Sequence, residues 1–271
     1  QIGFIYARNN VLSVKQELLD AIGNWELLRK ERKVSASKVR DIYYFMSVGV
    51  GVARGHKKLP GLGEDDLLDL EDKKNEIFSN NEKDFVLFFN SRNIRRKQIP
   101  DTMLAFRIFL DTLPKEKAEK CALILHTEVV SDHGTDLEAV RKILFPEYPN
   151  NILFSTEKLD NKTLNQLYNI ADAQILLTSN EGWGLTLTEA ILAGTPIIGN
   201  VTGGMQDQMR FEDEKGEWFT PTPDLPSNHT GKLKKHGCWA FPVYPTNRSL
   251  QGSPKTPYIW DDRCRPEDAC H

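Results

Sequence analysis

A glycine-containing stretch at residues 179–190 has residue types and spacing suited to binding a charged ligand. It reads Ser-Asn-Glu-Gly-Trp-Gly-Leu-Thr-Leu-Thr-Glu-Ala and follows an apolar segment. Gly182 and Gly184 permit a tight turn and a close approach of ligand to backbone, because neither carries a Cβ atom. We expect a helix to begin near Leu185. The free amide groups at its start would form the positive end of a dipole, which favours a phosphate.

Two carboxylates flank this predicted phosphate site, eight positions apart. Glu181 lies in the loop, and Glu189 lies about a turn inside the helix. Carboxylates accept hydrogen bonds from sugar hydroxyls, so the pattern suits a ligand with both phosphates and hydroxyls, such as a sugar nucleotide. A single glutamate in a loop or helix is more often an exposed, solvated residue than part of a site. The interpretation therefore depends on the whole segment from residue 179 to residue 190. The expected donor-binding residues are Gly182, Trp183, Gly184, Leu185, Thr186 and Glu189.

The string from Glu181 to Ile198 resembles the signature of retaining glycosyltransferases with the two-domain, B-type fold, specifically family four. It reads Glu-Gly-Trp-Gly-Leu-Thr-Leu-Thr-Glu-Ala-Ile-Leu-Ala-Gly-Thr-Pro-Ile-Ile. In that family two glutamates separated by seven residues lie in the carboxyl-terminal, donor-binding domain. The resemblance covers roughly residues 84–210. It implies that Glu181 contacts hydroxyls of the donor sugar and that Glu189 contacts the ribose. The tryptophan is a mild departure, since the family usually has phenylalanine or another aromatic residue there.

A basic turn at residues 90–97, Asn-Ser-Arg-Asn-Ile-Arg-Arg-Lys, adds to the resemblance. The family places an arginine and a lysine, with four residues between them, on the nucleotide diphosphate, and Arg92 and Lys97 fit that spacing. Gln98 replaces the usual glycine after the lysine. Fixed cations there would stabilise the negative charge that grows on the leaving oxygen. A solvated basic turn is the alternative. Two further cations are interpreted as surface or neighbouring charges: Arg95 and Arg96.

Weaker candidates each have an ordinary structural alternative. The family resemblance would place the nucleobase beside Phe154 to Leu159, which is otherwise a plain loop. Gly203-Gly204 resembles a glycine pair after the last core strand, or is a simple turn. An acceptor sugar could stack on the aromatic residues between Trp239 and Trp260, near Arg248 and Lys255, although packing of an insertion is the more ordinary interpretation. His126 and His133 are interpreted as structural or exposed histidines. Cys264 and Cys270 are rejected as metal ligands, because their spacing does not suit a tetrahedral zinc site.

The elements that must position these residues alternate regularly from residue 84 onward. Continuous apolar segments predict strands buried on both faces. These segments are Phe85–Phe89, Ala122–Leu125, Ile152–Phe154, Ala173–Leu177 and Pro196–Ile198. The helices expected between them cover 101–113, 136–144, 161–170 and 185–193. The alternation predicts an α/β fold with a doubly wound parallel sheet, in which ligands bind beyond the carboxyl ends of the strands.

The flanking segments are less regular. A helical rhythm runs through Val14–Arg32, a glycine cluster at 49–55 only loosely resembles a phosphate loop, and acidic residues 64–76 predict a solvated linker. Residues 211–262 hold many prolines and aromatics and predict a long irregular excursion.

These patterns divide the chain into two parts. We expect an incomplete amino-terminal, acceptor-side segment with a linker at 1–80, and a nucleotide-sugar-binding Rossmann-like domain at 81–271. The initial glutamine and the Pro-Glu-Asp helix start near the other end indicate a fragment. The acceptor half is expected to be missing or abbreviated.

The composition of the chain indicates which kinds of partner and which cellular compartment are expected. The 271 residues carry 35 Lys and Arg against 38 Asp and Glu, which argues against nucleic acid as the main partner. No apolar run approaches the roughly 18–20 residues of a membrane span, so no integral span is expected and a cytoplasmic location is favoured. Four cysteines are too few for a disulfide scaffold. No Asp-x-Asp pair stands beside the cations, so no obligatory metal is expected.

The sequence therefore predicts a glycosyltransferase that moves a sugar from a nucleoside diphosphate sugar to a saccharide, lipid or protein acceptor, with retention implied by the resemblance. No other cofactor is expected. A nucleotide-sugar-binding fragment without turnover and a sugar-nucleotide epimerase are the alternatives. A dehydrogenase is disfavoured, because no Gly-x-Gly-x-x-Gly follows a first strand. The base, the sugar and the acceptor are not specified.

Overall fold

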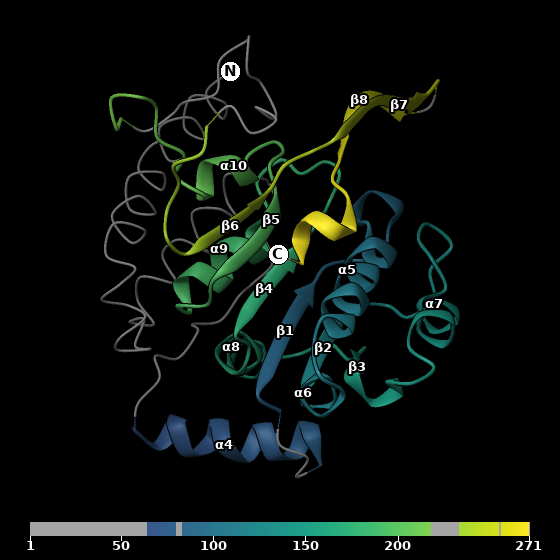
Figure 1. Ribbon diagram of the computed structural model, residues 1–271, viewed down its shortest axis with the longest axis vertical. Helices are drawn as coiled ribbons and strands as arrows, with labels where there is room; N and C mark the ends of the chain where they lie inside the picture. Colours follow the sequence, from purple (N-terminus) through teal and green to yellow (C-terminus); the bar gives the residue numbers. More distant parts are fainter. Residues whose placement is uncertain (1–63, 80–82, 218–232, 255, 271) are drawn as a thin grey trace. The chain divides into compact units, whose positions relative to one another are not determined.

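The computed structural model describes residues 64–79, 83–217, 233–254 and 256–270 (Figure 1). The helical rhythm at 14–32 and the glycine cluster at 49–55 lie outside the described residues. The chain divides into two compact units. Among the described residues, one unit holds 64–79, 158–170 and 189–195, and the other holds 83–157, 171–188 and 196–270.

The larger unit is built on a six-stranded sheet with the order β3-β2-β1-β4-β5-β6, and every neighbouring pair is parallel. This order, with flanking helices, is that of a doubly wound Rossmann-like fold, so the expected α/β class is confirmed. The strands are β1 (Phe85–Asn90), β2 (Cys121–His126), β3 (Ile152–Ser155), β4 (Ala173–Leu176), β5 (Ile197–Asn200) and β6 (Ala240–Val243).

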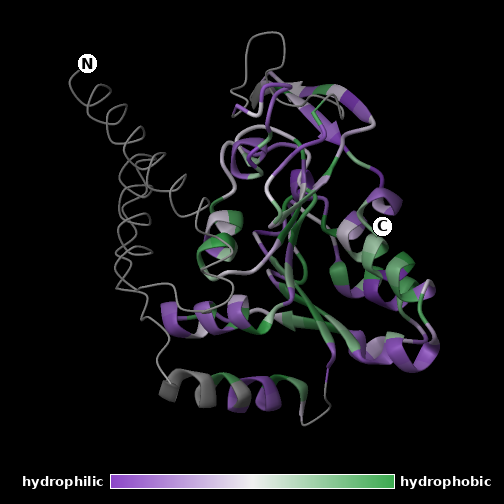
Figure 2. Ribbon diagram, turned by 60° about the vertical axis from the view of Figure 1, so that its left-hand side comes forward, coloured by the Kyte–Doolittle hydropathy of each residue, from purple (hydrophilic) through white to green (hydrophobic). Residues whose placement is uncertain are grey.

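The sheet forms because its strands are apolar on both faces. Four consecutive residues of β1, Val86 to Phe89, are buried, and β2 is buried over its first five residues. Such strands are stable only when helices cover both faces. Figure 2 shows the hydrophobic residues concentrated in these central strands. The first five strands lie where the sequence predicts them, with bounds shifted by a residue or two.

The helices between the strands have local causes in the sequence. Helix α5 (Ile99–Asp111) begins before the proline that was expected to precede it, because proline fits the first turn of a helix. It buries Phe106, whose ring centroid lies 6.1 Å from that of Phe145. At α7 (Leu137–Leu144), Asp136 caps the first turn by accepting a hydrogen bond from the Ala139 amide (2.9 Å). The remaining helices and 3-10 turns are η1 (Arg95–Lys97), α6 (Lys115–Glu119), η2 (Pro149–Asn151), α9 (Leu185–Leu192), α10 (Met205–Gln208) and η3 (Pro266–Ala269).

The segment that was expected to be a solvated linker is a helix of the smaller unit. Residues 64–76 belong to α4 (Glu64–Phe78), which contacts α8 (Asn161–Ile170). Leu70 and Phe78 lie eight positions apart, on one face of the helix, and both are buried. The acidic residues are interspersed with an apolar stripe, so this segment is a helix and not an extended linker.

The segment expected to be an irregular excursion, 211–262, contains regular structure. It supplies β6 and most of an antiparallel hairpin formed by β7 (Asn247–Ser253) and β8 (Thr256–Arg263), with a β-bulge between Gln251 and Ser253. Sequence patterning missed β6 because a proline interrupts it and one side chain, Phe241, is exposed. Within the described part of the chain, no helix combines the length and apolar character that crossing a bilayer requires.

The central strands should dominate the stability of the larger unit. Leu123→Ala, at a fully buried position of β2, is expected to lower the free energy of unfolding by about 2–5 kcal/mol, because it removes apolar contacts and leaves a cavity. Leu250→Ala makes the same chemical change at a side chain that is 54% exposed, and should change it by less than about 0.5 kcal/mol. Urea denaturation measures both, and equal effects would contradict the proposed core.

Candidate functional site

The candidate site lies where the order of strands reverses. From β1 the chain proceeds outward to β2 and β3, whereas β4 begins the other half of the sheet beside β1. In doubly wound sheets, ligands bind beyond the carboxyl ends of the two strands at this switch point. The loop at 91–98 follows β1, and the loop at 177–184 follows β4. These are the two segments in which the sequence places its candidate residues.

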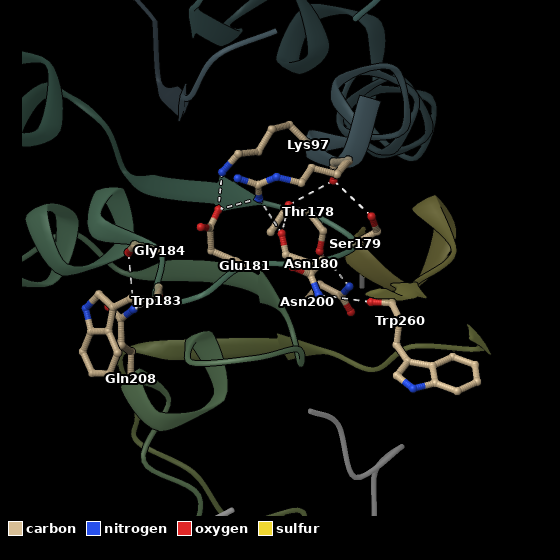
Figure 3. Close-up of polar contacts among 11 residues, drawn as sticks. Lys97, Thr178, Ser179, Asn180, Glu181, Trp183, Gly184, Asn200, Gln208 and Trp260 are labelled. Carbon is tan, nitrogen blue, oxygen red and sulfur yellow. Dashed lines mark hydrogen bonds and ion pairs between the residues drawn. The ribbon is translucent and has the colours of Figure 1, made fainter. Parts of the chain in front are cut away.

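Hydrogen bonds join the two loops directly (Figure 3). The carbonyl oxygen of Arg96 accepts from the Ser179 amide (2.8 Å), the Ser179 hydroxyl (3.2 Å) and the Thr178 hydroxyl (3.0 Å). Both of these donor residues are fully buried. Three donors on one carbonyl fix the loop after β1 against the loop after β4, so their side chains meet at defined positions.

An ion pair forms between side chains of the two loops. The Glu181 carboxylate accepts a hydrogen bond from the Lys97 ammonium, and Arg96 Nη1 lies 3.1 Å from the same oxygen (Figure 3). Arg96 Nη1 also donates to the carbonyl of Asn180 (2.5 Å). The side chains of Lys97 and Glu181 are only 10% and 15% exposed. Glu181, Arg92 and Lys97 are the residues that the sequence predicts to be catalytic, and the structure pairs two of them, Lys97 and Glu181.

Burial and charge act in opposite directions on this pair. Burial is the largest influence on Lys97 and lowers its pKa, and the Glu181 carboxylate offsets only part of that effect. Burial also raises the pKa of Glu181, but Lys97 and Arg96 together outweigh it and hold the pKa of the carboxyl below its ordinary value. The Glu181 carboxyl is therefore ionised at neutral pH, and each group is the principal compensation for the other's desolvation.

The remaining cations of the basic turn are arranged differently from the expectation. Arg92 is exposed, yet it is near enough for its charge to lower the pKa of Lys97. Arg95 is exposed as well. Arg96 was interpreted as a surface or neighbouring charge, whereas the structure places it in the ion pair with Glu181. The sequence signal was its adjacency to Lys97, which did not reveal which way a short 3-10 turn directs each side chain.

Gln98 adopts the backbone conformation for which glycine is best suited. Its φ is +50° and its ψ is 42°, in the left-handed region. Its side-chain amide donates to the carbonyl of Arg95 (3.0 Å). A residue with a Cβ atom is strained here by roughly 1–2 kcal/mol. Gln98 thus adopts a left-handed conformation that glycine would adopt without this cost.

Asn93 is a structural residue that the sequence reasoning missed. It is buried, and its Nδ2 donates to the carbonyls of Thr135 (2.7 Å) and Glu128 (3.1 Å), while its Oδ1 accepts from the Thr135 amide (3.0 Å). An added Cβ atom on Gly134 would lie 2.0 Å from this side chain. Asn93 therefore holds the loop after β2 against the loop after β1.

The glycine pair after β5 supports the loop that carries Glu181. Gly203 has a φ of +52°, and a Cβ atom there would lie 1.9 Å from the carbonyl oxygen of Glu181. A Cβ atom on Gly204 would lie 2.3 Å from the carbonyl oxygen of Gly182. Only glycine permits this approach of backbone to backbone, so the pair is more than the simple turn left open as its alternative.

Gln208 is a second missed residue, and it fixes the start of α9. Its fully buried side chain accepts from the Thr188 hydroxyl (2.9 Å) and donates to the carbonyls of Trp183 and Gly184. The indole of Trp183 in turn donates to the Thr188 hydroxyl (2.9 Å). Figure 3 shows Gln208 beneath the loop, beside Trp183. This network sets the orientation of the peptide groups that precede the helix.

Glu189 belongs to the smaller unit, and its partner there is the hydroxyl of Tyr168, which donates to Oε2. The carbonyl of Tyr168 accepts from the hydroxyl of Thr195 (2.5 Å). Burial raises the pKa of Glu189 to about 8. At neutral pH the carboxyl is therefore largely protonated, and it can donate a hydrogen bond as well as accept one.

The weaker candidates have varied surroundings. His126 lies at the end of β2, with Nδ1 2.9 Å from the hydroxyl of Ser155, and burial lowers its pKa. His133 is exposed. The segment from Phe154 to Leu159 begins in β3 and is partly or fully exposed. In the part of the chain that the structure describes, no three His, Cys, Asp or Glu side chains gather in a group that could hold a metal ion.

The site's charge suits a dianion. Arg92, Arg95, Arg96 and Lys97 are the four basic residues of the two loops and Glu181 is their one acidic residue, giving a formal net charge of +3. The start of α9, directly after Glu181, adds a partial positive charge. A diphosphate bound here would meet a compensating field with little water to screen it.

Comparison with known proteins relates this architecture to one family. The family model described as Glycosyl transferases group 1 matches residues 71–227, more than half of the chain. An uncharacterized glycosyltransferase of Methanocaldococcus jannaschii is 30% identical over 105 residues, which are 38% of this chain and 26% of that protein.

Solved structures overlap with the chain in part. WaaG, a glycosyltransferase involved in lipopolysaccharide biosynthesis, is 21% identical with a TM-score of 0.40, and the overlap covers 50% of this chain and 33% of WaaG. The C-terminal domain of LpcC, a group 1 family protein from Francisella tularensis, is 17% identical with a TM-score of 0.44, over 59% of this chain and 76% of that domain.

The close backbone contact at Gly203 predicts how an alanine substitution changes the stability of the fold. Gly203→Ala should lower the free energy of unfolding by at least about 2 kcal/mol, because it adds the cost of a left-handed alanine to a clash with the carbonyl of Glu181. Gly182→Ala is the matched control, since no atom lies within 4 Å of its added Cβ and its φ is not positive. Urea denaturation of both variants tests the close approach, which equal stabilities would disprove.

The ion pair makes a prediction about pH. Because the pKa of Glu181 is lowered in the folded state, its carboxylate stabilises the fold above its unfolded pKa of about 4.3, and this stabilisation is lost as the pH falls through the lower, folded pKa. Glu181→Gln should therefore be less stable than the wild type at pH 7, and the difference should shrink below pH of about 4. Chemical denaturation across pH 2–7, a range set by that roughly 4.3 pKa, measures it; a constant difference would contradict the ion pair.

Proposed function

Since the chain belongs to the glycosyl transferases group 1 family, we propose that it transfers a sugar from a nucleoside diphosphate sugar to an acceptor, with retention of configuration. The observation that supports this most is the cluster of Arg96, Lys97 and Glu181 at the switch point of the sheet, directly before α9. It combines cations for a diphosphate with a carboxylate for sugar hydroxyls. Both are needed within one site by a donor of this class.

The cations would bind the diphosphate of the donor. When the bond between the sugar and the diphosphate breaks, negative charge grows on the leaving phosphate oxygen. Lys97 is held in place and nearly excluded from water, so its charge is weakly screened. It therefore stabilises the transition state more than the ground state, as does Arg96 beside it. Arg92 is exposed and would contribute to attraction of the donor.

Glu181 would change partners when the donor binds. In the structure its carboxylate balances Lys97 and Arg96. The phosphate oxygens would take over these cations, because they carry more charge than one carboxylate. Glu181 is then available to accept hydrogen bonds from hydroxyls of the donor sugar. Lys97 and Arg96 thus face an anion in both states, so neither cation is left without a counter-charge.

The start of α9 would complete the donor site. The backbone from Gly182 to Thr186 can approach a phosphate closely, and the helix dipole favours its charge. Glu189 would contact the ribose of the donor. With a pKa of about 8, its carboxyl can both donate to and accept from ribose hydroxyls at neutral pH. Tyr168 holds one of its oxygens in place.

The proposed chemistry uses charge stabilisation by side chains and backbone, without an obligatory metal. Retention requires that the acceptor oxygen attack from the face that the diphosphate leaves, or that two inversions occur in sequence. Binding of the donor without turnover is the second candidate function, since the chain covers only 26% of the length of the curated protein that it matches.

The cations and carboxylates should control donor turnover. Lys97→Ala is expected to lower kcat/KM for the nucleoside diphosphate sugar at least tenfold, and about 100-fold if it acts like a typical transition-state donor. Glu181→Ala and Glu189→Ala should each lower it at least tenfold, a factor that corresponds to roughly 1.4 kcal/mol of barrier. The assay measures transfer and nucleotide release with uridine, guanosine and adenosine diphosphate sugars.

Lys115→Ala is the control for these variants. Its side chain is 75% exposed in α6, so removing this lysine should leave kcat/KM unchanged. Unchanged kinetics in Lys97→Ala, Glu181→Ala and Glu189→Ala would refute the assignment of the site. Binding of the donor without release of nucleotide would favour a binding role over transfer.

A further inference from the structure

The hairpin of β7 and β8 is anchored at the same edge of the sheet as the candidate site. The Asp262 amide donates to the carbonyl of Ser179 (2.8 Å), and the Asn200 side chain donates to the carbonyl of Asp262 (2.6 Å). The carboxylate of Asp262 accepts from the Thr202 hydroxyl (2.8 Å). Asp262 is fully buried, so these bonds hold the base of the hairpin rigidly against the ends of β4 and β5.

A further bond links the hairpin to the loop that carries Glu181. Asn180 donates from its side chain to the carbonyl of Trp260 (3.1 Å), and Asn180 directly precedes Glu181 (Figure 3). The indole of Trp260 points away from Glu181 in that view. Figure 1 shows the hairpin extending beyond the carboxyl ends of β1 and β4. A ligand that reacts beside Glu181 would therefore reach the hairpin with its more distant part.

One face of the hairpin presents flat and apolar groups to solvent. Trp260 pairs in register with Leu250, and Tyr258 lies two residues away on the same face. These side chains are 48%, 54% and 64% exposed, respectively. The guanidinium carbon of Arg248 lies 4.8 Å from the centroid of the Trp260 ring. The face thus combines two aromatic rings, spaced about 7 Å apart along a strand, with a planar group that carries N–H donors.

The size of this face argues against a protein partner. The three apolar side chains expose on the order of 300 Å² together, from typical side-chain areas, whereas a stable protein interface needs about 800 Å² from each partner. Ile259, between the two rings in sequence, is 36% exposed and lies on the opposite face of the strand. A saccharide fits better, since the C–H face of a pyranose ring is small, flat and apolar, and its hydroxyls need hydrogen-bond donors at the rim.

We propose that the face formed by Arg248, Leu250, Tyr258 and Trp260 binds a saccharide portion of the acceptor. The proposal rests on the proposed function, because the anchoring to Ser179 and Asn180 places the face beside the site of transfer. Ring stacking on Trp260 and Tyr258 supplies the affinity. Arg248, which pairs with the Asp262 carboxylate (3.2 Å), packs against the Trp260 ring and holds it in place. The hairpin therefore selects saccharide-containing acceptors over simple alcohols or lipids without sugar.

Saccharide binding can be measured without knowing the natural acceptor. The probes are α- and β-linked trisaccharides of glucose, mannose, galactose and N-acetylglucosamine, titrated by calorimetry and tryptophan fluorescence. We expect at least one trisaccharide to bind. Trp260→Ala and Tyr258→Ala should each weaken its binding at least tenfold, whereas Trp260→Phe, which keeps a ring, should stay within about threefold, or roughly 0.7 kcal/mol. Phe241→Ala removes a ring that is 54% exposed outside the hairpin, and should change nothing.

Titration with uridine, guanosine and adenosine diphosphates separates the two proposals. Unchanged diphosphate binding in Trp260→Ala, together with lost trisaccharide binding, supports the saccharide face. Absence of trisaccharide binding, or equal binding by Trp260→Ala, overturns it even if diphosphates bind. Concentration-dependent self-association that Trp260→Ala abolishes also overturns it, in favour of a second copy of the chain. Trisaccharide binding through Trp260 without any diphosphate binding leaves the face standing and removes the proposed function.

Discussion

The ion pair that Glu181 forms with Lys97 and Arg96 is the interaction on which the candidate site depends. It joins the loops after β1 and β4, which come from opposite halves of the sheet. Burying one of these charges alone would be unfavourable by several kcal/mol. Each loop therefore stabilises the position of the other by supplying the compensating charge, and the three hydrogen bonds to the Arg96 carbonyl hold the two loops together.

The residues that support this unit are uncharged, and each acts on backbone. Gly203 and Gly204 let the segment after β5 touch the loop at 181–183, Gln208 binds the carbonyls that precede α9, and Asn93 fixes the next loop along the sheet. Preorganised dipoles of this kind are effective because they need not reorient when charge develops. The framework of the site is therefore built from peptide groups, and few side chains remain for contact with a ligand.

The sequence predicted the five core strands because buried parallel strands are continuous apolar runs, and the resemblance to a family singled out Glu181 and Lys97, which the structure pairs. It did not predict β6, whose proline and exposed Phe241 resemble an irregular segment, or α4, whose acidic residues obscure its apolar stripe. The role of Arg96 was also hidden. From the sequence alone, any of three consecutive basic residues could pair with the carboxylate. The short 3-10 turn sets the direction of each side chain and so determines which of them pairs with Glu181.

The balance of charge in the two loops bears on how a ligand would enter. A diphosphate does not have to attract Lys97 out of water, because the fold already buries this lysine beside Glu181 and partly buries Arg96. Exchange of one anion for another keeps a counter-charge beside both cations, and much of the desolvation of Lys97 is completed during folding. The cost that remains is to free Glu181, and hydroxyls of a sugar compensate this carboxylate better than an apolar ligand could. In the proposed function, selection for a ligand with both groups would follow from a single carboxylate.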